Sequence, residues 1–494
     1  MKNNWDILSI ILGCVAALLI VLWRHSKSKY KLPPGPWGLP VVGYIPFMGK
    51  YPFKTFIKLS EKYGKVFSLN LGGHYTVILN DFESVKDAFS NNAILDRPPH
   101  LFDFHPDGLG FTGYNGKKWL EQRRHTMRTL KDVGLGKIPW ESCVEAEVED
   151  FIQFLEEQGG KPLDVFDPLS ASVSNNMTSI ILGKRLLKGD PRRRTVDDGV
   201  QAVINTFVSV SLVFLFPRLS RFFAKFGLTK KSEDYQKMVR FNRFIRNEME
   251  SRKKIPQIEL NEDIFIDGYL LEKEKLKEKG VENWYNENNL VGTSQALIVG
   301  GSDTSRTLLC WLFLAMVTYP DIQKKIQKEI DVVLGKDGKL KWAERAKLPL
   351  TYAATLEVHR WRTIAPLGAV HQAAQDTNIG DYDIPKGTHV ISNIYALHND
   401  PKYWKDPDVF RPERFLHEDG SLKMQRLDSY APFSLGRRNC PGELVAMMEI
   451  FQYFIAIMQK FEIRAVDNTP LILEGMFQAT FRPHPQKLRY TPRG

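Results

Sequence analysis

The positions of apolar residues along the chain predict several helices and two short hairpins. Residues 53–63 and 444–458 carry apolar side chains at the three-to-four-residue spacing of a helix with one buried face. Residues 66–79 contain two strand-like runs joined through a pair of glycines, and residues 376–393 show a second hairpin pattern. The stretch 101–116 is rich in aromatic residues, glycine and proline, which predicts a long loop. Long loops in compact domains are often functional.

The apolar segment Leu290–Met316 predicts one long helix that is apolar all round and therefore buried. Residues 300–305, with the sequence Gly-Gly-Ser-Asp-Thr-Ser, lie at its centre. Two glycines inside a helix cost about 1 kcal/mol each relative to alanine, and an acid is unfavourable in a core. A bulge or local widening would explain both features, because freed carbonyls need polar partners. An ordinary kinked helix is the alternative.

The N-terminus carries a nearly unbroken apolar run over Ile7–Trp23. At 1.5 Å per residue it extends about 25 Å, just enough to span a thin bilayer. Basic residues follow it, which by the positive-inside rule places the rest of the chain in the cytosol. A cleaved signal peptide is the alternative, but a basic segment stands where a cleavage site belongs. We predict a transmembrane anchor over 1–23, a basic and proline-rich linker over 24–40, and a cytosolic domain over 41–494.

Composition narrows the classes of partner and compartment. The chain has 494 residues, is 43% hydrophobic and carries a net charge of +11. This charge suits an anionic membrane surface or an acidic protein partner, whereas no recognised motif or basic tail supports nucleic-acid binding. The four cysteines are scattered and form no Cys-x-x-Cys pair. Their distribution argues against a disulfide scaffold or zinc site and fits a reducing compartment.

Residues 433–442, Phe-Ser-Leu-Gly-Arg-Arg-Asn-Cys-Pro-Gly, precede the helical pattern of 444–458. Pro441 suits the first position of that helix, which would make Cys440 its N-cap. Free backbone N–H groups and the helix dipole would then favour a thiolate. Gly436 and Gly442 allow close approach to a flat ligand, and Arg438 could reach an anionic group on it. A buried structural cysteine is the alternative reading of Cys440 alone.

The ten-residue pattern resembles the haem-binding signature of the cytochromes P450, Phe-x-x-Gly-x-Arg-x-Cys-x-Gly, at every fixed position. The resemblance implies haem b (iron protoporphyrin IX) with Cys440 as the axial ligand of its iron. It also implies that Phe433, Arg438 and Gly442 belong to the cofactor site. In this class the thiolate pushes electron density to the iron and favours O–O cleavage.

Three further motifs match the family in order and spacing. Residues 300–305 resemble its oxygen-activation motif, which implies that Thr304 hydrogen-bonds dioxygen and its water while Asp303 helps to relay protons. The motif Glu357-x-x-Arg360 and the segment 410–415, Phe-Arg-Pro-Glu-Arg-Phe, imply a buried structural network of Glu357, Arg360 and Arg414 that supports the haem loop.

Other resemblances concern the haem propionates and a redox partner. The family implies propionate contacts from Trp119, Arg123 and His371. Further basic residues, Lys117, Lys118, Arg124 and Arg128, crowd the helix that carries Trp119, and Arg437 could join them. A solvated charged face is the common interpretation of such a run. Our hypothesis is an electrostatic dock for an acidic flavoprotein reductase.

Residues 207–223 combine many aromatic and aliphatic side chains with Pro217 and Arg218. The run is too short and too broken to span a membrane. A core segment and a segment at the membrane interface are equally compatible with it. The family resemblance implies that this region covers the substrate entrance and dips into the membrane.

The resemblance therefore implies a mainly α cytochrome P450 fold, a helical haem-binding domain with small antiparallel β-sheets, plus one N-terminal transmembrane helix. The expected function is a haem-thiolate monooxygenase that inserts one atom of O₂ into a lipophilic steroid, fatty acid or xenobiotic. Electrons would come from NADPH through NADPH–cytochrome P450 reductase, with cytochrome b5 as a further candidate partner. The expected location is the endoplasmic reticulum membrane, with a single span, lipid contact and the domain 41–494 on the cytosolic face.

Family position implies that ten residues line the substrate pocket: Leu101, Phe102, Phe104, Phe207, Ala296, Val299, Ile364, Leu367, Met476 and Phe477. Two other functions stay open. One is an isomerase or dehydratase of the same fold that rearranges a peroxide without O₂ or reductase, although the Asp303–Thr304 pair argues against it. The other is a haem-based binding or sensor protein without turnover.

Overall fold

The computed structural model describes residues 13, 15, 30–107, 110–134, 140–206, 217–467 and 470–493. The predicted anchor over 1–23 lies outside these residues, apart from Gly13 and Val15. Within the described ranges, no helix has both the length and the hydropathy needed to cross a bilayer. The described part of the predicted linker lies against the domain, because Ser68 donates hydrogen bonds to the carbonyls of Pro33 (2.7 Å) and Pro34 (2.8 Å).

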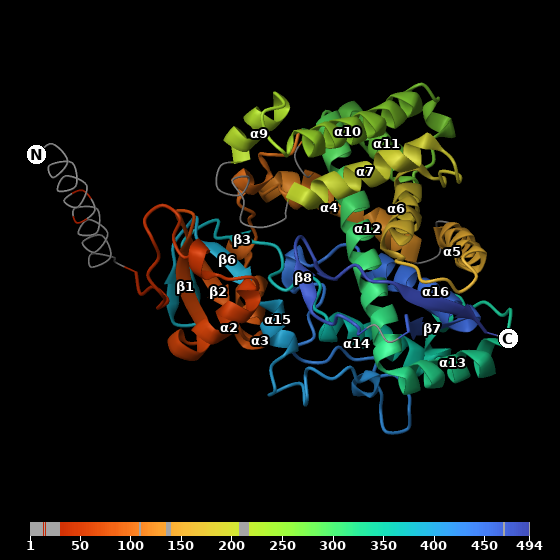
Figure 1. The fold of residues 1–494 in the computed structure, drawn as a ribbon. Helices are drawn as coiled ribbons and strands as arrows, with labels where there is room; N and C mark the ends of the chain where they lie inside the picture. Colours follow the sequence, from red (N-terminus) through yellow and green to blue (C-terminus); the bar gives the residue numbers. More distant parts are fainter. Residues whose placement is uncertain are drawn as a thin grey trace, which may run out of the picture.

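Helices dominate the fold, as the family resemblance implied (Figure 1). Their bounds are α2 Pro52–Tyr63, α3 Phe82–Ser90, α4 Gly116–Gly134, α5 Trp140–Glu157, α6 Phe166–Leu182, α7 Pro191–Thr206, α9 Pro217–Lys225, α10 Ser232–Lys253, α11 Phe265–Glu278, α12 Glu287–Thr318, α13 Pro320–Leu334, α14 Pro349–Trp361, α15 Ile394–His398 and α16 Glu443–Lys460.

Within the described part of the chain, the strands are short and gather in four small sheets. They are β1 Val66–Leu71, β2 His74–Leu79, β3 His371–Gln372, β4 Thr377–Ile379, β5 Tyr382–Ile384, β6 His389–Ser392, β7 Phe461–Ala465, β8 Gly475–Phe477, β9 Phe481–Pro483 and β10 Leu488–Pro492. The largest sheet has the order β1-β2-β6-β3, and β2 runs parallel to β6 within it. The other sheets are the antiparallel pairs β10-β7, β4-β5 and β8-β9.

The hairpin predicted over residues 66–79 is confirmed as the antiparallel pair β1 and β2. The hairpin predicted over 376–393 is wrong in its turn and its extent. Only β4 and β5 form that hairpin. Its turn falls at Gly380 and Asp381, whereas the sequence pattern predicts the turn at residues 382–388. The last strand of the region, β6, pairs with β2 across more than 300 residues of sequence. Local alternation cannot distinguish such a distant partner from a neighbouring one.

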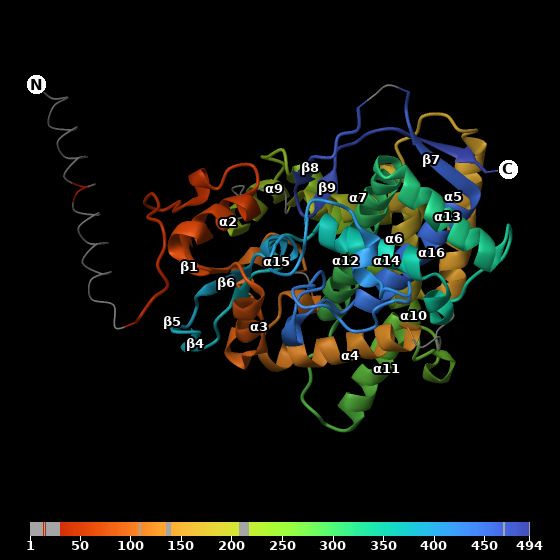
Figure 2. The same cartoon turned by 90° about the horizontal axis from the view of Figure 1, so that it is seen from below.

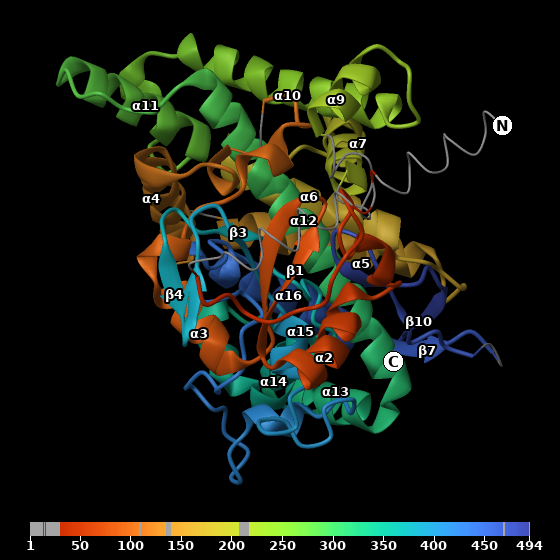
Figure 3. The ribbon, with the colours of Figure 1, turned by 90° about the vertical axis from the view of Figure 1, so that its left-hand side faces the viewer.

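Helix α12 is the centre of the molecule (Figure 1). It packs against α6, α10, α7, α14 and α16, and most of its side chains are buried. Figure 2 shows α4 along one side of this core, and Figure 3 shows α10 and α11 across one end of it. The predicted long buried helix is therefore confirmed, because a helix with apolar residues on every face needs neighbours on every face.

The bulge, one of the two interpretations of residues 300–305, is absent, since α12 is continuous α-helix from Glu287 to Thr318. The two glycines have different surroundings. A Cβ at Gly301 would lie 2.5 Å from the sulfur of Met177, so this glycine allows α6 to pack closely. A Cβ at Gly300 would meet nothing within 4 Å. The Thr304 hydroxyl donates to the Gly300 carbonyl (2.7 Å), which supplies a polar partner without breaking the helix.

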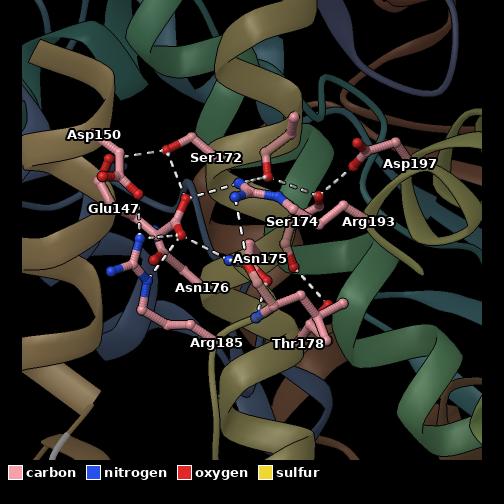
Figure 4. A network of polar contacts seen from close by, with 12 residues as sticks. Glu147, Asp150, Ser172, Ser174, Asn175, Asn176, Thr178, Arg185, Arg193 and Asp197 are labelled. Carbon is pink, nitrogen blue, oxygen red and sulfur yellow. Dashed lines mark hydrogen bonds and ion pairs between the residues drawn. The ribbon is translucent and has the colours of Figure 1, made fainter. Parts of the chain in front are cut away.

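A buried polar network joins α5, α6 and α7 around Glu147, whose side chain is 1% exposed (Figure 4). Its carboxylate accepts hydrogen bonds from Arg185 (2.6 Å), Arg193 (2.9 Å) and the Asn175 amide (2.7 Å). The side chain of Ser172 extends the network to Tyr453 on α16. Two arginines and an amide thus satisfy a carboxylate that burial alone would make costly.

Candidate active site

Cys440 lies between α15 and α16, in residues 433–442, which we call the cysteine loop, and it comes two residues before the N-cap of α16. The helix begins at Glu443 with Gly442 as N-cap, so the predicted N-cap position of Cys440 is wrong. The N–H of Cys440 donates instead to the carbonyl of Phe433 (2.8 Å), which closes the loop on itself. Gly436 has a φ of +72°, and a Cβ there would lie 2.0 Å from the Phe89 carbonyl oxygen. Only glycine permits this contact between the loop and α3.

Cys440 is an exposed residue, in contrast to the buried Cys310. The surrounding protein nevertheless raises the pKa of the Cys440 thiol to about 11, although the Gly442 N–H and Arg123 favour the thiolate. A metal ion bound to the sulfur would reverse this balance, because a coordinating thiol is deprotonated. Cys440 is therefore suited to a metal ligand and poorly suited to a free nucleophile.

Helix α12 presents one accessible stripe although the rest of its centre is buried. Ala296, Val299, Gly300 and Thr304 are exposed or half-buried and follow one another at helical spacing. The stripe stays accessible although α12 packs against α6, α7, α10, α14 and α16. The stripe is apolar except for the Thr304 hydroxyl and the Gly300 carbonyl, which form a hydrogen bond with each other.

Asp303 lies on the buried side of α12, next to Thr304 in sequence but on a different face. Its side chain pairs with Arg306 and accepts a hydrogen bond from Thr480 (2.9 Å). The Arg306 guanidinium also bonds the Ser170 hydroxyl (2.7 Å) and stacks 3.9 Å from the Phe166 ring centre. Asp303 thus has two protein partners, and the structure gives no hydrogen bond between Asp303 and Thr304 side chains.

Three arginines gather between the cysteine loop, α4 and the segment before α4. Arg438 donates to the carbonyls of Leu95 (2.7 Å) and Tyr114 (2.6 Å). Arg97 donates to the carbonyls of Ala369 (2.7 Å) and Val370 (2.8 Å). Arg123 donates to the side-chain oxygen (2.6 Å) and carbonyl (3.0 Å) of Asn439. Among the described residues, none of the three forms an ion pair with a carboxylate.

The positive charge of this arginine group would be stabilised by an anionic ligand. Burial, then repulsion from Arg97 and more weakly from Arg123, lowers the pKa of Arg438 to about 8, and the nearby Asp96 carboxylate offsets only part of this shift. Burial lowers the pKa of Arg97 to about 10, with a smaller contribution from Arg123. The Nε1 atom of Trp119 is buried beside Arg438 and has no hydrogen-bond partner. A buried donor without a partner is unfavourable, so an anionic ligand here would satisfy the indole and offset the repulsion.

His371, on β3, lies at the edge of the same group. It is 2% exposed, its Nδ1 bonds the Ile94 carbonyl (2.7 Å) and its ring stacks 4.0 Å from that of Phe89. Burial, followed by the charge of Arg97, lowers its pKa well below the ordinary value. His371 is therefore a neutral hydrogen-bonding group at pH 7.

These residues fit haem. Cys440 offers the sulfur for iron, the stripe on α12 offers a largely apolar surface for the porphyrin, and the arginine group with Trp119 offers donors for two carboxylates. The sequence analysis missed Arg97. Its nearest carbonyl partners are about 270 residues away along the chain, at Ala369 and Val370. A lone arginine before two prolines gives no local signal of such a contact.

Glu357, Arg360 and Arg414 come together as the sequence motifs implied. Arg360 binds both carboxylate oxygens of Glu357 at 2.7 and 2.8 Å, and Arg414 reaches one of them at 3.2 Å. The Arg411 N–H adds a further bond of 3.0 Å to Glu357. The side chains of Glu357 and Arg360 have no exposed surface. The network ties α14 to residues 412–415, which precede the cysteine loop.

The predicted pocket residues fall into two apolar groups that share Val299. Phe104 is buried with Tyr235 and Met238, and Phe102 and Val299 pack against that cluster. Ile364, Leu367 and Phe477 belong to the main core, as does Val299. The remaining described members, Leu101, Ala296 and Met476, are half-buried. Phe207 lies outside the described residues.

The cysteine loop and α4 together form a basic groove on the surface. It has a volume of about 440 Å³ and is lined by Arg124, Met127, Arg128, Leu130, Lys131, Pro441 and Leu444. Lys117 and Arg437 are exposed, and Lys118 is half-buried over the ring of Tyr114 at 3.5 Å. Among the described residues, Arg124 and Arg128 have no ion-pair partner. The groove thus presents cations and apolar side chains close to Cys440.

Comparison with known proteins gives a consistent result over almost the whole chain. The family model described as Cytochrome P450 matches residues 33–490. Cytochrome P450 18a1 of Drosophila melanogaster is 31% identical over 98% of this chain and 91% of its own length. Cytochrome P450 2J2 of Homo sapiens is 31% identical over 98% of this chain and 96% of its own length. Cytochrome P450 2A6 of Homo sapiens is 31% identical over 93% of both chains.

Proposed function

The chain belongs to the cytochrome P450 family, and from that premise we propose that it oxidises a lipophilic small molecule with electrons from a flavoprotein reductase. As a family member it is a haem monooxygenase whose haem b is bound through a cysteine thiolate. The haem supplies the activation of dioxygen. We assign the substrate to the steroids, fatty acids or lipophilic foreign compounds, and the electron source to NADPH–cytochrome P450 reductase.

We assign the cofactor contacts to the residues whose geometry fits them. Cys440 supplies the axial sulfur, while Phe433 and Gly442 hold the loop that carries it. Arg97, Arg123 and Arg438 hold the propionates together with Trp119 and His371. Glu357, Arg360 and Arg414 have a structural role, because they fasten the segment that precedes the cysteine loop.

The accessible stripe on α12 is the single observation that carries the proposed reaction. A flat apolar surface with one hydroxyl, at Thr304, can hold an apolar substrate while delivering protons at one point. Thr304 can pass on its proton only by giving up its bond to the Gly300 carbonyl. Asp303 holds a proton-accepting carboxylate one residue away, where Thr480 and Arg306 fix its orientation.

One exposed apolar surface supports a location at a membrane. Helix α9 exposes Leu219, Phe222 and Phe223, and Phe226 follows it with 59% exposure. Basic residues Arg218 and Lys225 lie among them, a composition that suits the boundary of a bilayer. Together with the anchor predicted over 1–23, α9 favours a single-pass protein of the endoplasmic reticulum membrane with residues 41–494 in the cytosol.

The basic groove beside Cys440 supports an acidic redox partner. Its arginines and lysines provide electrostatic attraction, and Met127 and Leu444 provide apolar contact area. We propose this groove as the dock for the reductase, and cytochrome b5 as a second acidic candidate for the same surface.

The reaction is tested with purified haem-loaded protein, the reductase and NADPH. Binding of lipophilic compounds is followed by the shift of the haem spectrum, and product formation must require both NADPH and O₂. Thr304→Ala should keep the haem spectrum but divert electrons from product to hydrogen peroxide. Thr318→Ala is the matched control, since the Thr318 hydroxyl makes the same 2.7 Å bond four residues back, to Leu314, at the end of the same helix. Unchanged coupling in Thr304→Ala would remove Thr304 from the mechanism.

The sulfur ligand is tested separately by the difference spectrum of the reduced protein with carbon monoxide. Wild type and Cys143→Ser should both give the Soret band that names the family, and Cys440→Ser should lose it. Retention of the band in Cys440→Ser would overturn the assignment of Cys440.

A further inference from the structure

Three histidines from distant parts of the chain meet at the edge of the four-stranded sheet. His74 is the first residue of β2, and His389 is the first residue of β6. In the parallel β2–β6 pair Thr76 is opposite His389, so His74 and His389 project from the same face, two residues out of register. His100 comes from the short helix Pro99–Phe102, which lies over that face.

The planes of the three imidazole rings are nearly parallel, and the ring centres form a triangle. The ring centre of His74 is 4.4 Å from that of His100 and 4.7 Å from that of His389, and the centres of His100 and His389 are 5.5 Å apart. One ring nitrogen of each histidine lies within 4.8 Å of one nitrogen of each other histidine. A tetrahedral metal with bonds of about 2.0–2.1 Å needs ligand nitrogens about 3.3 Å apart. Because a metal lies close to the plane of each imidazole that binds it, the side chains must turn out of their parallel arrangement to hold one ion.

Two of the ring nitrogens have no partner in the protein. The Nε2 atoms of His100 and His389 are buried and make no hydrogen bond. His389 is 3% exposed, so water does not satisfy it. Burial also lowers the pKa of His74 and His100, and it lowers that of His389 to about 3 with help from the other two. All three rings are therefore neutral at pH 7, the form that binds a metal.

Ring stacking by itself leaves these nitrogens unexplained. Buried polar atoms in folded proteins nearly always have partners, and a phenyl ring would stack equally well without one. Convergence of three imidazoles, with nitrogens that lack partners, is the arrangement expected of a ligand set for a first-row transition metal.

We propose that His74, His100 and His389 form a binding site for a divalent transition metal, with Zn²⁺ as its representative ion. The fourth position would be open to water, as in other sites with three histidines. The site shares no residue with the haem contacts assigned above and does not depend on the identity of the substrate.

A metal ion at this site would connect parts of the chain that lie near the proposed substrate pocket. A bound ion would fasten the segment Pro99–Phe102 to β2 and β6. That segment carries Leu101 and Phe102 of the proposed pocket, and the next residue, Asp103, pairs with Arg218 of α9 at 2.6 Å. Zn²⁺ would therefore hold the connection between the sheet and α9 in one arrangement.

The test measures Zn²⁺ binding to the full-length, haem-loaded protein in detergent, by competition with a chromophoric chelator. Wild type should bind one ion, and X-ray absorption at the zinc edge should report nitrogen ligands at about 2.0–2.1 Å. Each of His74→Gln, His100→Gln and His389→Gln should weaken binding at least tenfold. His417→Gln, at an exposed histidine, is the control and should change nothing.

Each variant is checked by its carbon monoxide spectrum, so that loss of Zn²⁺ binding is not confused with loss of the fold. Zn²⁺ should also raise the melting temperature of wild type but not of the triple variant, because a ligand stabilises only the state that binds it. Wild type that binds no Zn²⁺ at micromolar concentration, or a folded triple variant that binds it as tightly as wild type, would overturn the proposal.

Discussion

Two groups of buried or half-buried arginines lie around the cysteine loop and differ in how their charge is balanced. Arg360 and Arg414 share the carboxylate of Glu357, at distances of 2.7 to 3.2 Å. Arg97, Arg123 and Arg438 donate to carbonyls and two side-chain amide oxygens, and among the described residues no carboxylate forms an ion pair with them. We call these the closed group and the open group.

The difference shows what each group is for. In the closed group, attraction to Glu357 offsets the cost of burying two guanidinium ions, so the protein supplies its own counter-charge. In the open group, mutual repulsion adds to burial, as the lowered pKa of Arg438 shows. Such an arrangement is incomplete until a ligand supplies negative charge. We therefore expect the closed group to govern folding stability and the open group to govern haem affinity.

The largest effect should come from breaking the closed group. Glu357→Gln leaves two buried guanidinium ions without their counter-charge, which is expected to destabilise the fold by about 3–5 kcal/mol. Denaturant unfolding monitored by far-UV circular dichroism would measure this loss. Glu344→Gln is the control, because Glu344 pairs with Lys347 on the surface and exposed pairs contribute about 0–1 kcal/mol. Equal stability of the two variants would abolish the distinction between the groups.

The next effect concerns the open group. Arg438→Gln removes a charged donor for the propionates but also relieves repulsion with Arg97 and Arg123. Hydrogen bonds to charged groups contribute about 1.5–3 kcal/mol, so haem affinity should fall about ten- to a hundredfold. Haem transfer to an excess of a competing apoprotein would measure the loss. The exposed neighbour Arg437, which contacts Asn92, gives the control variant Arg437→Gln.

A comparison of two unfolding experiments separates the groups further. In the haem-free protein, Arg438→Gln should destabilise much less than Glu357→Gln. Lost bonds to the carbonyls of Leu95 and Tyr114 are partly offset by the reduced repulsion. If Arg438→Gln lowers the unfolding free energy of the haem-free protein as much as Glu357→Gln does, the open group has a structural role.

A smaller loss of affinity is expected when the haem is altered and the protein is left unchanged. Haem with esterified propionates lacks the negative charges that the open group is expected to bind. Wild type should hold this haem several-fold more weakly than ordinary haem. Arg438→Gln should discriminate less between the two, because the variant and the ester remove opposite sides of one interaction. Equal discrimination by wild type and variant would mean that Arg438 does not contact a propionate.

The sequence predicted the closed group and only part of the open one. Glu357, Arg360 and Arg414 belong to motifs with fixed spacing, so the resemblance to a family was enough to bring them together. Arg97 belongs to no such motif, and its contacts exist only because β3 and the segment before α4 become neighbours in the fold. The network around Glu147 escaped prediction for the same reason, since it joins three helices through side chains without a shared pattern (Figure 4).

Local rules also explain the errors in the predicted elements. A proline suits the first turn of a helix, yet α16 begins after Pro441, because Cys440 is held in the loop by its bond to Phe433. Two glycines suggested a bulge in α12, but Gly301 serves close packing against Met177. In both cases a tertiary contact decided between local conformations that the sequence leaves nearly equal in free energy.

The smallest effect tests whether a missing counter-charge matters at the surface. Arg124 and Arg128 also have no ion-pair partner among the described residues, but they are exposed, so water and salt screen them. Arg124→Gln with Arg128→Gln should leave stability and haem affinity unchanged. It should slow haem reduction by the reductase several-fold at low ionic strength, and the difference should vanish at high salt because only the steering of an acidic partner is lost. Stopped-flow reduction in the presence of carbon monoxide measures this rate. If the rate in wild type does not change with ionic strength, the basic groove is not the dock. Of the two arginine clusters without ion pairs, only the open group would then have a function.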